Sequence, residues 1–477
     1  MTVKILNGNE LLIQGGLEAG FQLYTGYPGS PVADFFNILH ERKDELHAKG
    51  IRVVLSNSEA HAGAMASGAK MAGQNVLVAM KSMGLHVAAD SLSVGNFANL
   101  GFLDGVGRKG CVVIAVGVDP WSISTSSPAD SRFLFKHFHI PFLEPSTPQE
   151  LKDWMAIALE LSQESSVYVG LLLTTFMAEG GGRVEIKDEK KLSHELITLD
   201  PSKFNLSENV MVPPNSLGAD QRMIRERFPH YLKALASQKL AKIFGNADSP
   251  IAIVSTGAAF EILKQVLEEN QLMNQVHLYK CAGAYALDES TLVPFLRKHE
   301  RVLVVEEKRG FLETEVKELA VRHGLNLQVW GKLFGTQEGF PAHGGLNYEL
   351  VHAGLKRALT LLGSNCALQE LPSPRRLQDA IPKRLPTFCP GCPHRETLSL
   401  MKELRADLAT KNIQLISHGD VGCYSLSFLE PFKEMHDLSA MGQGGAMGAG
   451  TDLFTTNPSV VLMGDSTFFH SGMTAIS

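Results

Sequence analysis

Cysteines at metal-binding spacing stand in the C-terminal part of the chain. Cys389 and Cys392 frame a Pro-Gly pair, a tight turn that aims both sulfurs the same way, and Cys423 follows in "GDVGCY". A C-x-x-C pair can be a redox dithiol, half of a zinc site or part of an iron-sulfur site. A zinc site needs a fourth ligand, for which His394 or His418 would serve. Three inert core cysteines are the least favoured interpretation.

A carboxylate follows the last apolar run, "SVVLM". Gly464, Asp465 and Ser466 come directly after it, at the strand end where open α/β sheets bind ligands. An Asp at that position can hold Mg²⁺, whose other ligands often include phosphate oxygens. The alternative is an Asp that only caps the helix that follows.

A glycine-rich segment, "MGQGGAMGAG", precedes that strand and opens a helix. Its Gly442, Gly444 and Gly445 would let a phosphate approach the free backbone N–H groups of a helix start. Small residues that allow tight helix packing are the competing interpretation.

An acidic residue, Glu59, stands just past the strand "IRVVLS", at the start of a helix. It is either a capping carboxylate or a buried acid shared between two domains. Small side chains recur along one face of this helix, so a second helix or subunit could approach closely. This face carries Ala60, Gly63, Ala64 and Ser67, with Met71 at the same helical spacing.

Composition excludes several classes of function. With 44% hydrophobic residues, 20% charged residues and 44 glycines, the chain is typical of a soluble globular protein. A net charge of -6 without long Lys or Arg clusters argues against nucleic acid or an anionic membrane surface as partner. No apolar run reaches the roughly 18 residues of a membrane span, and the six cysteines are too sparse for a disulfide framework. We expect a cytoplasmic protein.

One glycine motif is rejected. "GVGRKG", residues 105–110, has the spacing of a dinucleotide fingerprint but precedes a strand instead of following one. The fingerprint needs a preceding strand and a following helix, so nicotinamide or flavin binding is not predicted there.

Alternating strand and helix patterns predict an α/β protein of several domains. Runs such as "NVLVAM", "CVVIAVG", "VYVGLLLTT" and "IRVVLS" read as parallel strands buried on both faces. Strand and helix patterns also predict a second, smaller α/β domain and a third one that opens at "CPGCPHR". The predicted organisation is a domain over 1–190, a linker over 191–248, a domain over 249–365, a linker over 366–388 and a domain over 389–477.

These motifs, in this order, resemble the thiamine diphosphate-dependent 2-oxoacid:ferredoxin oxidoreductases, most closely the large (alpha) subunits of the indolepyruvate branch. The resemblance covers nearly the whole chain. It rests on "GNELLIQGGLEAGFQLYTGYPGSPVADF", "SNSEAHAGAMASGAKMAGQNVLVAMKSMGLHVAADSL", "ADSRFL", "PFLEPSTPQE", "FCPGCPHR", "GDVGCY" and "GDSTFFHSGMT".

The resemblance implies three doubly wound domains: a thiamine pyrimidine-binding domain, a transketolase C-terminal-like domain and an incomplete diphosphate-binding domain. By resemblance, Glu59 hydrogen-bonds the pyrimidine ring and Asp465 binds Mg²⁺ beside the glycine-rich segment and the cofactor's diphosphate. The turn "TGYPGSP", with Tyr27, Pro28 and Gly29, lines the substrate side of the pocket. Cys389, Cys392 and Cys423 match three ligands of a [4Fe-4S] cluster.

The implied activity is oxidative decarboxylation of a 2-oxoacid, an aryl pyruvate such as indolepyruvate, to an acyl-CoA. Implied partners are coenzyme A, ferredoxin and a smaller beta-type subunit, in a homodimer or heterotetramer. Two other classes stay open: a non-oxidative thiamine-dependent decarboxylase or carboligase, and a non-catalytic subunit that kept the fold.

The sequence also departs from the family. An Asn that completes the Mg²⁺ site and a fourth cluster cysteine would lie beyond Ser477, so we expect further sequence or another polypeptide to supply them. Two-cluster ferredoxin cysteine runs are absent. "LLLTTFMAEGGG" lacks the expected Arg residues, and "DPWSISTSSPAD" replaces the usual Gly-Met-His-Ser, which weakens the substrate assignment.

Overall fold

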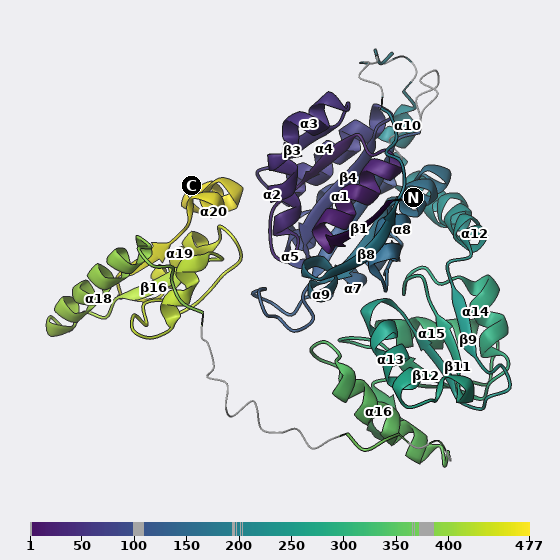
Figure 1. The fold of residues 1–477 in the computed structure, drawn as a ribbon. Helices are drawn as coiled ribbons and strands as arrows, with labels where there is room; N and C mark the ends of the chain where they lie inside the picture. The colour runs from purple at the N-terminus through teal and green to yellow at the C-terminus, as the bar shows by residue number, and fades with distance from the viewer. Residues whose placement is uncertain are drawn as a thin grey trace. The chain divides into compact units, whose positions relative to one another are not determined.

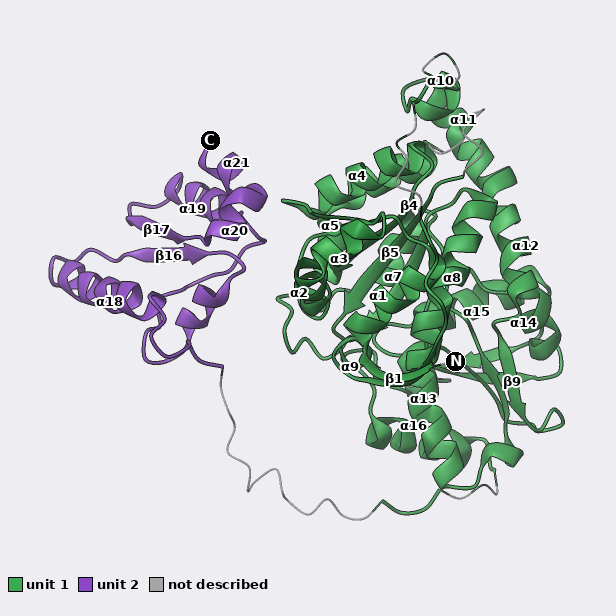
Figure 2. Ribbon diagram, turned by 45° about the horizontal axis from the view of Figure 1, so that its top comes forward, with its two compact units in different colours: residues 1–371 green, residues 372–477 purple. Residues whose placement is uncertain are grey.

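Two compact units make up the computed structural model, Met1–Leu371 and Pro372–Ser477 (Figure 2), and each is described by itself. None of the described helices is both long and apolar enough to cross a membrane. The structure describes residues 2–98, 109–192, 196, 198–200, 202, 204–364, 366, 368–371 and 386–477.

A six-stranded parallel sheet forms the heart of the first unit, in the order β3-β2-β4-β5-β7-β6. Its strands are β2 (Leu23–Gly26), β3 (Arg52–Leu55), β4 (Asn75–Lys81), β5 (Cys111–Val118), β6 (Phe142–Leu143) and β7 (Val169–Thr174). The α/β class predicted from the sequence is confirmed. One detail is wrong: β3 is an edge strand with Arg52 and Leu55 exposed, not one buried on both faces.

Helices cover this sheet, and local signals in the sequence set their ends. Helix α1 (Gly8–Ala19) begins with a capping box, in which Asn7 and Glu10 bond each other's backbone N–H. It packs along α8 (Pro148–Ser165), as Figure 1 shows. The other elements here are α2 (Ala33–Glu41), α3 (Lys43–Ala48), α4 (Glu59–Met71), α5 (Ser82–Val87), α6 (Ala89–Phe97), α7 (Ser131–His137), α9 (Thr175–Glu179) and the antiparallel pair β1 (Thr2–Asn7) and β8 (Gly181–Ile186).

Much of the predicted linker 191–248 is helical. Tyr231, Ala234 and Leu235 are buried, and this i, i+3, i+4 spacing gives α12 an apolar face that packs on α8. The second half of the stretch is therefore part of the unit and not an extended connection. Its elements are α10 (Leu206–Asn209), α11 (Asn215–Arg222), the π-helix η2 (Met223–Arg227), α12 (Phe228–Gln238) and β9 (Lys242–Gly245).

A second sheet belongs to the same unit, in the order β13-β12-β10-β11-β9, parallel except for β9. One continuous hydrophobic cluster runs from the first sheet into the second, and Phe142 N–H donates to Tyr285 O at 2.6 Å across the junction. The elements are β10 (Ala252–Ser255), α13 (Gly257–Glu269), the 3-10 turn η3 (Met273–Gln275), β11 (His277–Lys280), α14 (Glu289–Leu296), β12 (Arg301–Val305), α15 (Phe311–Arg322), β13 (Gln328–Trp330), β14 (Leu333–Phe334), β15 (Gln337–Glu338) and α16 (Tyr348–Leu361).

The second unit is small and has a sparse core. Its two strands are parallel, and its buried apolar cluster contains Phe388, Leu398 and Met401. Large apolar side chains such as Phe454 and Phe469 are exposed. Its elements are α18 (His394–Thr410), β16 (Ile416–Gly419), the 3-10 turn η4 (Cys423–Phe428), α19 (Gly444–Asp452), β17 (Ser459–Leu462), α20 (Asp465–Thr467), the π-helix η5 (Phe468–Gly472) and α21 (Met473–Ile476).

Candidate functional site

Glu59 lies at the carboxyl edge of the first sheet, the ligand-binding edge of open α/β folds. It is the first residue of α4, directly after the N-cap Ser58, and its side chain is 2% exposed. Gly84 makes room for it, because a Cβ at that position would stand 2.6 Å from Glu59 Oε1. The fold thus buries a carboxylate beside a strand end and keeps the neighbouring position free of a side chain.

Lys81 is the second charged residue at this edge, and no role was predicted for it from the sequence. It ends β4, and its stem passes close to Gly29, where a Cβ would stand 2.7 Å from Lys81 Cδ. Burial lowers the pKa of the ammonium, while the charge of Glu59 acts in the opposite direction. The signal was available, since Lys81 follows the apolar run "NVLVAM" as Asp465 follows "SVVLM".

The predicted substrate-side turn, Tyr27 to Gly29, follows β2, the strand next to β4. Tyr27 is buried, Pro28 is exposed and Gly29 is partly buried. The turn therefore lies beside Lys81, in agreement with the close approach of the Lys81 stem to Gly29. Whether it contacts substrate stays a prediction.

The serine-rich segment that follows β5 reaches the turn after β2 and the start of α5, which follows β4. Ser124 Oγ donates to Ser30 Oγ at 2.9 Å, and Ser127 Oγ donates to Met83 Sδ at 3.4 Å. The buried Asp119 anchors the segment by accepting from Ser124 N–H at 2.8 Å. Burial would raise the pKa of Asp119, but hydrogen bonds from backbone and hydroxyl groups outweigh it and lower the pKa.

The small-residue face of α4 packs within the chain. Helix α6 lies against α4, with Ser91 and Leu92 where a side chain at Gly63 would be. Ser67 Oγ donates to Gly63 O at 3.1 Å and bonds Tyr168 OH at 3.0 Å. The helix that approaches Gly63 and Ser67 is thus α6 of the same unit.

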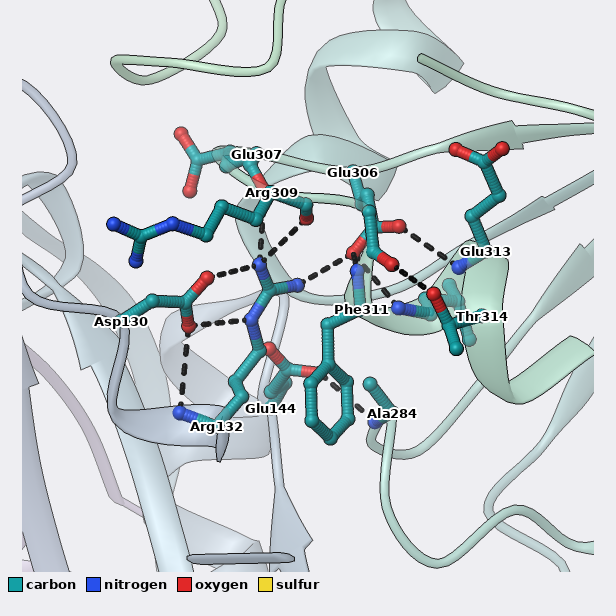
Figure 3. Close-up of polar contacts among 12 residues, drawn as sticks. Asp130, Arg132, Glu144, Ala284, Glu306, Glu307, Arg309, Phe311, Glu313 and Thr314 are labelled. Atoms are coloured by element: carbon teal, nitrogen blue, oxygen red, sulfur yellow. Dashed lines mark hydrogen bonds and ion pairs between the residues drawn. The ribbon is translucent and has the colours of Figure 1, made fainter. Parts of the chain in front are cut away.

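A buried ion cluster joins the two sheets (Figure 3). Arg132 Nη2 donates to Asp130 Oδ2 at 2.7 Å, and Arg132 Nη1 donates to Glu306 Oε2 at 2.6 Å. Arg132 Nη2 also donates to the carbonyls of Glu307 and Arg309. The arginine, from "ADSRFL", thereby ties the end of the first sheet's serine-rich segment to the turn after β12.

A cavity of about 50 Å³ borders this cluster, lined in part by Arg132, Glu144, Thr174 and Lys308. Burial raises the pKa of Glu144 to about 7, although Arg132 opposes the shift. Glu144 Oε2 accepts from Ala284 N–H at 2.9 Å. Sequence patterns had not indicated any of these groups as neighbours.

In the second unit, the ends of β16 and β17 bring two Gly-Asp pairs to one edge, because the strands are parallel. Asp465 is exposed, and its Oδ1 accepts from Ser466 N–H at 2.8 Å. Asp420, which was not among the residues predicted from the sequence, is fully buried. It accepts from Gly442 N–H at 3.0 Å and from the hydroxyl of Tyr424, so it anchors the glycine-rich turn. The repeated "GD" after both strands was the available signal.

The predicted phosphate-binding glycines stand at the start of α19. Gly442 has φ +77°, a conformation that favours glycine. Gly444 and Gly445 are the first residues of the helix, whose N-cap makes no side-chain hydrogen bond. The partly exposed Gly464 precedes α20 and accepts from Thr467 Oγ1 at 2.7 Å. The carboxylate of Asp420 also accepts a hydrogen bond from the backbone N–H of Gly444, so one first-turn N–H group of α19 already has a partner. Phosphate binding at this helix start stays a prediction.

The three cysteines lie in the same unit without forming a complete metal site. Cys389 and Cys423 are exposed and Cys392 is partly buried. Cys423 Sγ lies 3.3 Å from His394 Nε2. Within the described ranges, no group of three or more His, Cys, Asp or Glu side chains is arranged to hold a metal ion. Their role as cluster ligands stays a prediction.

Comparison with known proteins places this geometry in a family. Residues 14–230 match the family model described as pyruvate flavodoxin/ferredoxin oxidoreductase, thiamine diphosphate-binding, and residues 241–372 match the indolepyruvate oxidoreductase domain. Among solved structures, a 2-oxoglutarate:ferredoxin oxidoreductase from Magnetococcus marinus is similar, with a TM-score of 0.57 and 15% identity. The match covers 75% of this chain and 65% of that one, and it supports the fold alone.

Curated relatives extend the match over nearly the whole chain. Indolepyruvate oxidoreductase subunit IorA of Methanothermobacter thermautotrophicus is 30% identical over 98% of this chain and 71% of its own length. IorA of Pyrococcus abyssi is 27% identical over 99% and 72%. The chain therefore belongs to the IorA family of indolepyruvate oxidoreductase subunits, within the thiamine diphosphate-dependent 2-oxoacid:ferredoxin oxidoreductases.

Proposed function

We propose that this chain carries the thiamine-binding part of a cytoplasmic enzyme that oxidatively decarboxylates an aryl pyruvate, such as indolepyruvate, to an acyl-CoA and passes the electrons to ferredoxin. The observation that carries the proposal is Glu59, a carboxylate buried at the ligand edge of the first sheet with Gly84 leaving it room. The names of the relatives support the indolepyruvate branch.

The residues present fit thiamine diphosphate. In the first unit Glu59 is a buried acid that would hold the aminopyrimidine ring. In the second unit the glycine-rich start of α19 and the exposed carboxylate of Asp465 would hold the diphosphate and Mg²⁺. When bound, the cofactor supplies a carbanion-stabilising electron sink.

With the cofactor bound, Glu59 would have one chemical role, which is to hold a proton shared with a nitrogen of the aminopyrimidine ring. A carboxylate in a site closed to water holds that proton at a fixed atom, because bulk solvent does not compete for it. Asp420 has a supporting role in the second unit, since its bond to Gly442 N–H fixes the turn whose N–H groups would receive phosphate oxygens.

The proposal includes further components. Cys389, Cys392 and Cys423 would provide three ligands of a [4Fe-4S] cluster, with the fourth from outside this sequence. A smaller beta-type subunit, coenzyme A and ferredoxin complete the enzyme, as a homodimer or heterotetramer. The description of the relatives as subunits of an oxidoreductase supports this composition.

An anaerobic assay of the complete complex tests the proposal. With indolepyruvate, coenzyme A and a viologen acceptor, the wild-type complex should reduce the viologen, and Glu59→Gln should lower the rate by about 10²–10⁴-fold, the usual contribution of an acid-base group. Glu41→Gln, at an exposed position on α2, is the matched control. Absence of reduction with any aryl pyruvate contradicts the substrate assignment, and aldehyde release without iron and sulfide indicates the non-oxidative alternative.

A further inference from the structure

Lys81 occupies the centre of the ligand edge. Its strand, β4, lies between β2 and β5, so the side chain starts between the turn that ends in Gly29 and the segment anchored by Asp119. The stem lies along the turn, with Cγ, Cδ and Cε 3.1, 2.7 and 3.3 Å from the position of a Cβ on Gly29. A side chain at that glycine would displace the lysine, so the turn and Lys81 are matched in shape.

The ammonium of Lys81 lacks an acceptor. Within the described part of the chain, it makes no hydrogen bond or ion pair. Other lysines with little exposure all reach an oxygen: Lys70 reaches Ser166 O, Lys152 reaches Glu18, Lys280 reaches Glu150, Lys308 reaches Ala129 O and Lys332 reaches Pro341 O. A partly buried cation without an acceptor is unfavourable, and an anionic ligand relieves this cost.

The substrate class supplies such an anion. The family acts on 2-oxoacids, which carry a carboxylate next to the reacting carbonyl. We propose that the Lys81 ammonium receives the carboxylate of the 2-oxoacid at the edge that Glu59 and the turn through Gly29 share. This placement rests on the proposed function, in which Glu59 holds the cofactor ring.

The serine-rich segment borders the same place. Ser124 bonds Ser30, which follows Gly29 in the sequence. Ser127 bonds Met83, two residues after Lys81. The segment therefore borders the edge that carries Lys81. Lys81 itself is partly buried, and a charge-assisted hydrogen bond gains strength where water is partly excluded.

Unreactive ligands test the inference in the purified complex that contains this chain. 3-Phenylpropionate has the carboxylate and side chain of phenylpyruvate without its 2-oxo group, and 3-phenylpropanamide lacks the negative charge. Lys81→Met should weaken binding of the acid roughly 10- to 100-fold, the value of a hydrogen bond between charged groups, and leave the amide within twofold. Lys81→Arg should keep most of the affinity for the acid, and Lys43→Met, at an exposed position, should change neither.

Equal weakening of both ligands by Lys81→Met, or of neither, overturns the inference. A shifted pH profile of turnover with unchanged acid binding also overturns it, since Lys81 would then act on Glu59. Lys81→Gln replaces Lys81→Met if the latter does not fold. If the wild-type complex binds propionate but neither phenyl ligand, the assignment of an aryl substrate fails. The effect of Lys81→Met on the binding of propionate and of propanamide then tests the role of Lys81.

Discussion

Replacing Arg132 by methionine should destabilise the first unit by about 3–5 kcal/mol, the usual cost of removing one partner from a buried ion pair. The arginine neutralises two carboxylates whose side chains are only 3% (Asp130) and 1% (Glu306) exposed. Methionine fills similar space but leaves both carboxylates without their cation. Bringing such charges into a low-dielectric interior is what makes the change severe.

The structure divides this cost unequally. Glu306 keeps three backbone donors at the start of α15, from Phe311, Leu312 and Glu313, at 2.8–3.1 Å. Asp130 keeps one backbone bond, from residue 132 at 3.3 Å. The penalty therefore concentrates on Asp130, and adding Asp130→Asn to Arg132→Met should recover about 1–3 kcal/mol, the desolvation cost of one unpaired group.

Tryptophan fluorescence during urea unfolding measures the effect selectively. Trp121, Trp154 and Trp330 account for the three tryptophans of the chain and all belong to the first unit. The control is Arg42→Met, which removes an exposed pair with Glu45 and should cost under about 1 kcal/mol. A cost for Arg132→Met no larger than that of the control would refute the reasoning.

Three further predictions follow from local geometry. Gly84→Ala should lower turnover in the viologen assay at least about tenfold, because its Cβ would displace the Glu59 carboxylate. Gly68→Ala should keep activity, because a Cβ at this exposed position of α4 would have no neighbouring atom within 4 Å. Burial raises the pKa of Glu144 to about 7, so with rising pH the unfolded chain loses this proton before the folded chain does. The unfolding free energy of the wild type, compared with that of Glu144→Gln, should therefore fall between about pH 4.5 and 7, by at most about 1.4 kcal/mol per pH unit. Urea titrations at a series of fixed pH values measure it. Asp420→Ala should weaken the glycine-rich turn by about 1–3 kcal/mol, seen as faster hydrogen exchange at the Gly442 amide; unchanged exchange would contradict its anchoring role.

Local patterns in the sequence predicted the parts that depend on neighbours along the chain. Apolar runs indicated the strands and their parallel arrangement, and a strand-end acid indicated Glu59. The same rule, applied to all charged residues after buried strands, also identifies Lys81 and Asp420. Both residues stand in stretches quoted for the family resemblance, but neither was assigned a role there, although the local signal for both is present.

Contacts between side chains far apart in the sequence could not be predicted from local patterns. Arg132 and Glu306 are 174 positions apart, and nothing in either local pattern specifies the other. The helix α12 was missed for a different reason: its apolar spacing is regular, but the whole stretch 191–248 was predicted to be a linker. Tertiary packing on α8 decides its helical state, in line with the dominance of packing over propensity.

The buried ion cluster and the candidate site are parts of one segment, residues 119–132. Asp119 anchors its start beside the ligand edge, and Arg132 fixes its end to the second sheet. Between them, Lys308 Nζ donates to Ala129 O, and Trp121 packs where a side chain on Gly345 would be. Because the second sheet's domain supplies these contacts, it determines where Ser124 lies over the edge that carries Lys81. This domain therefore contributes to the shape of the candidate site, and its Lys308 lines a cavity together with Thr174, the last residue of β7.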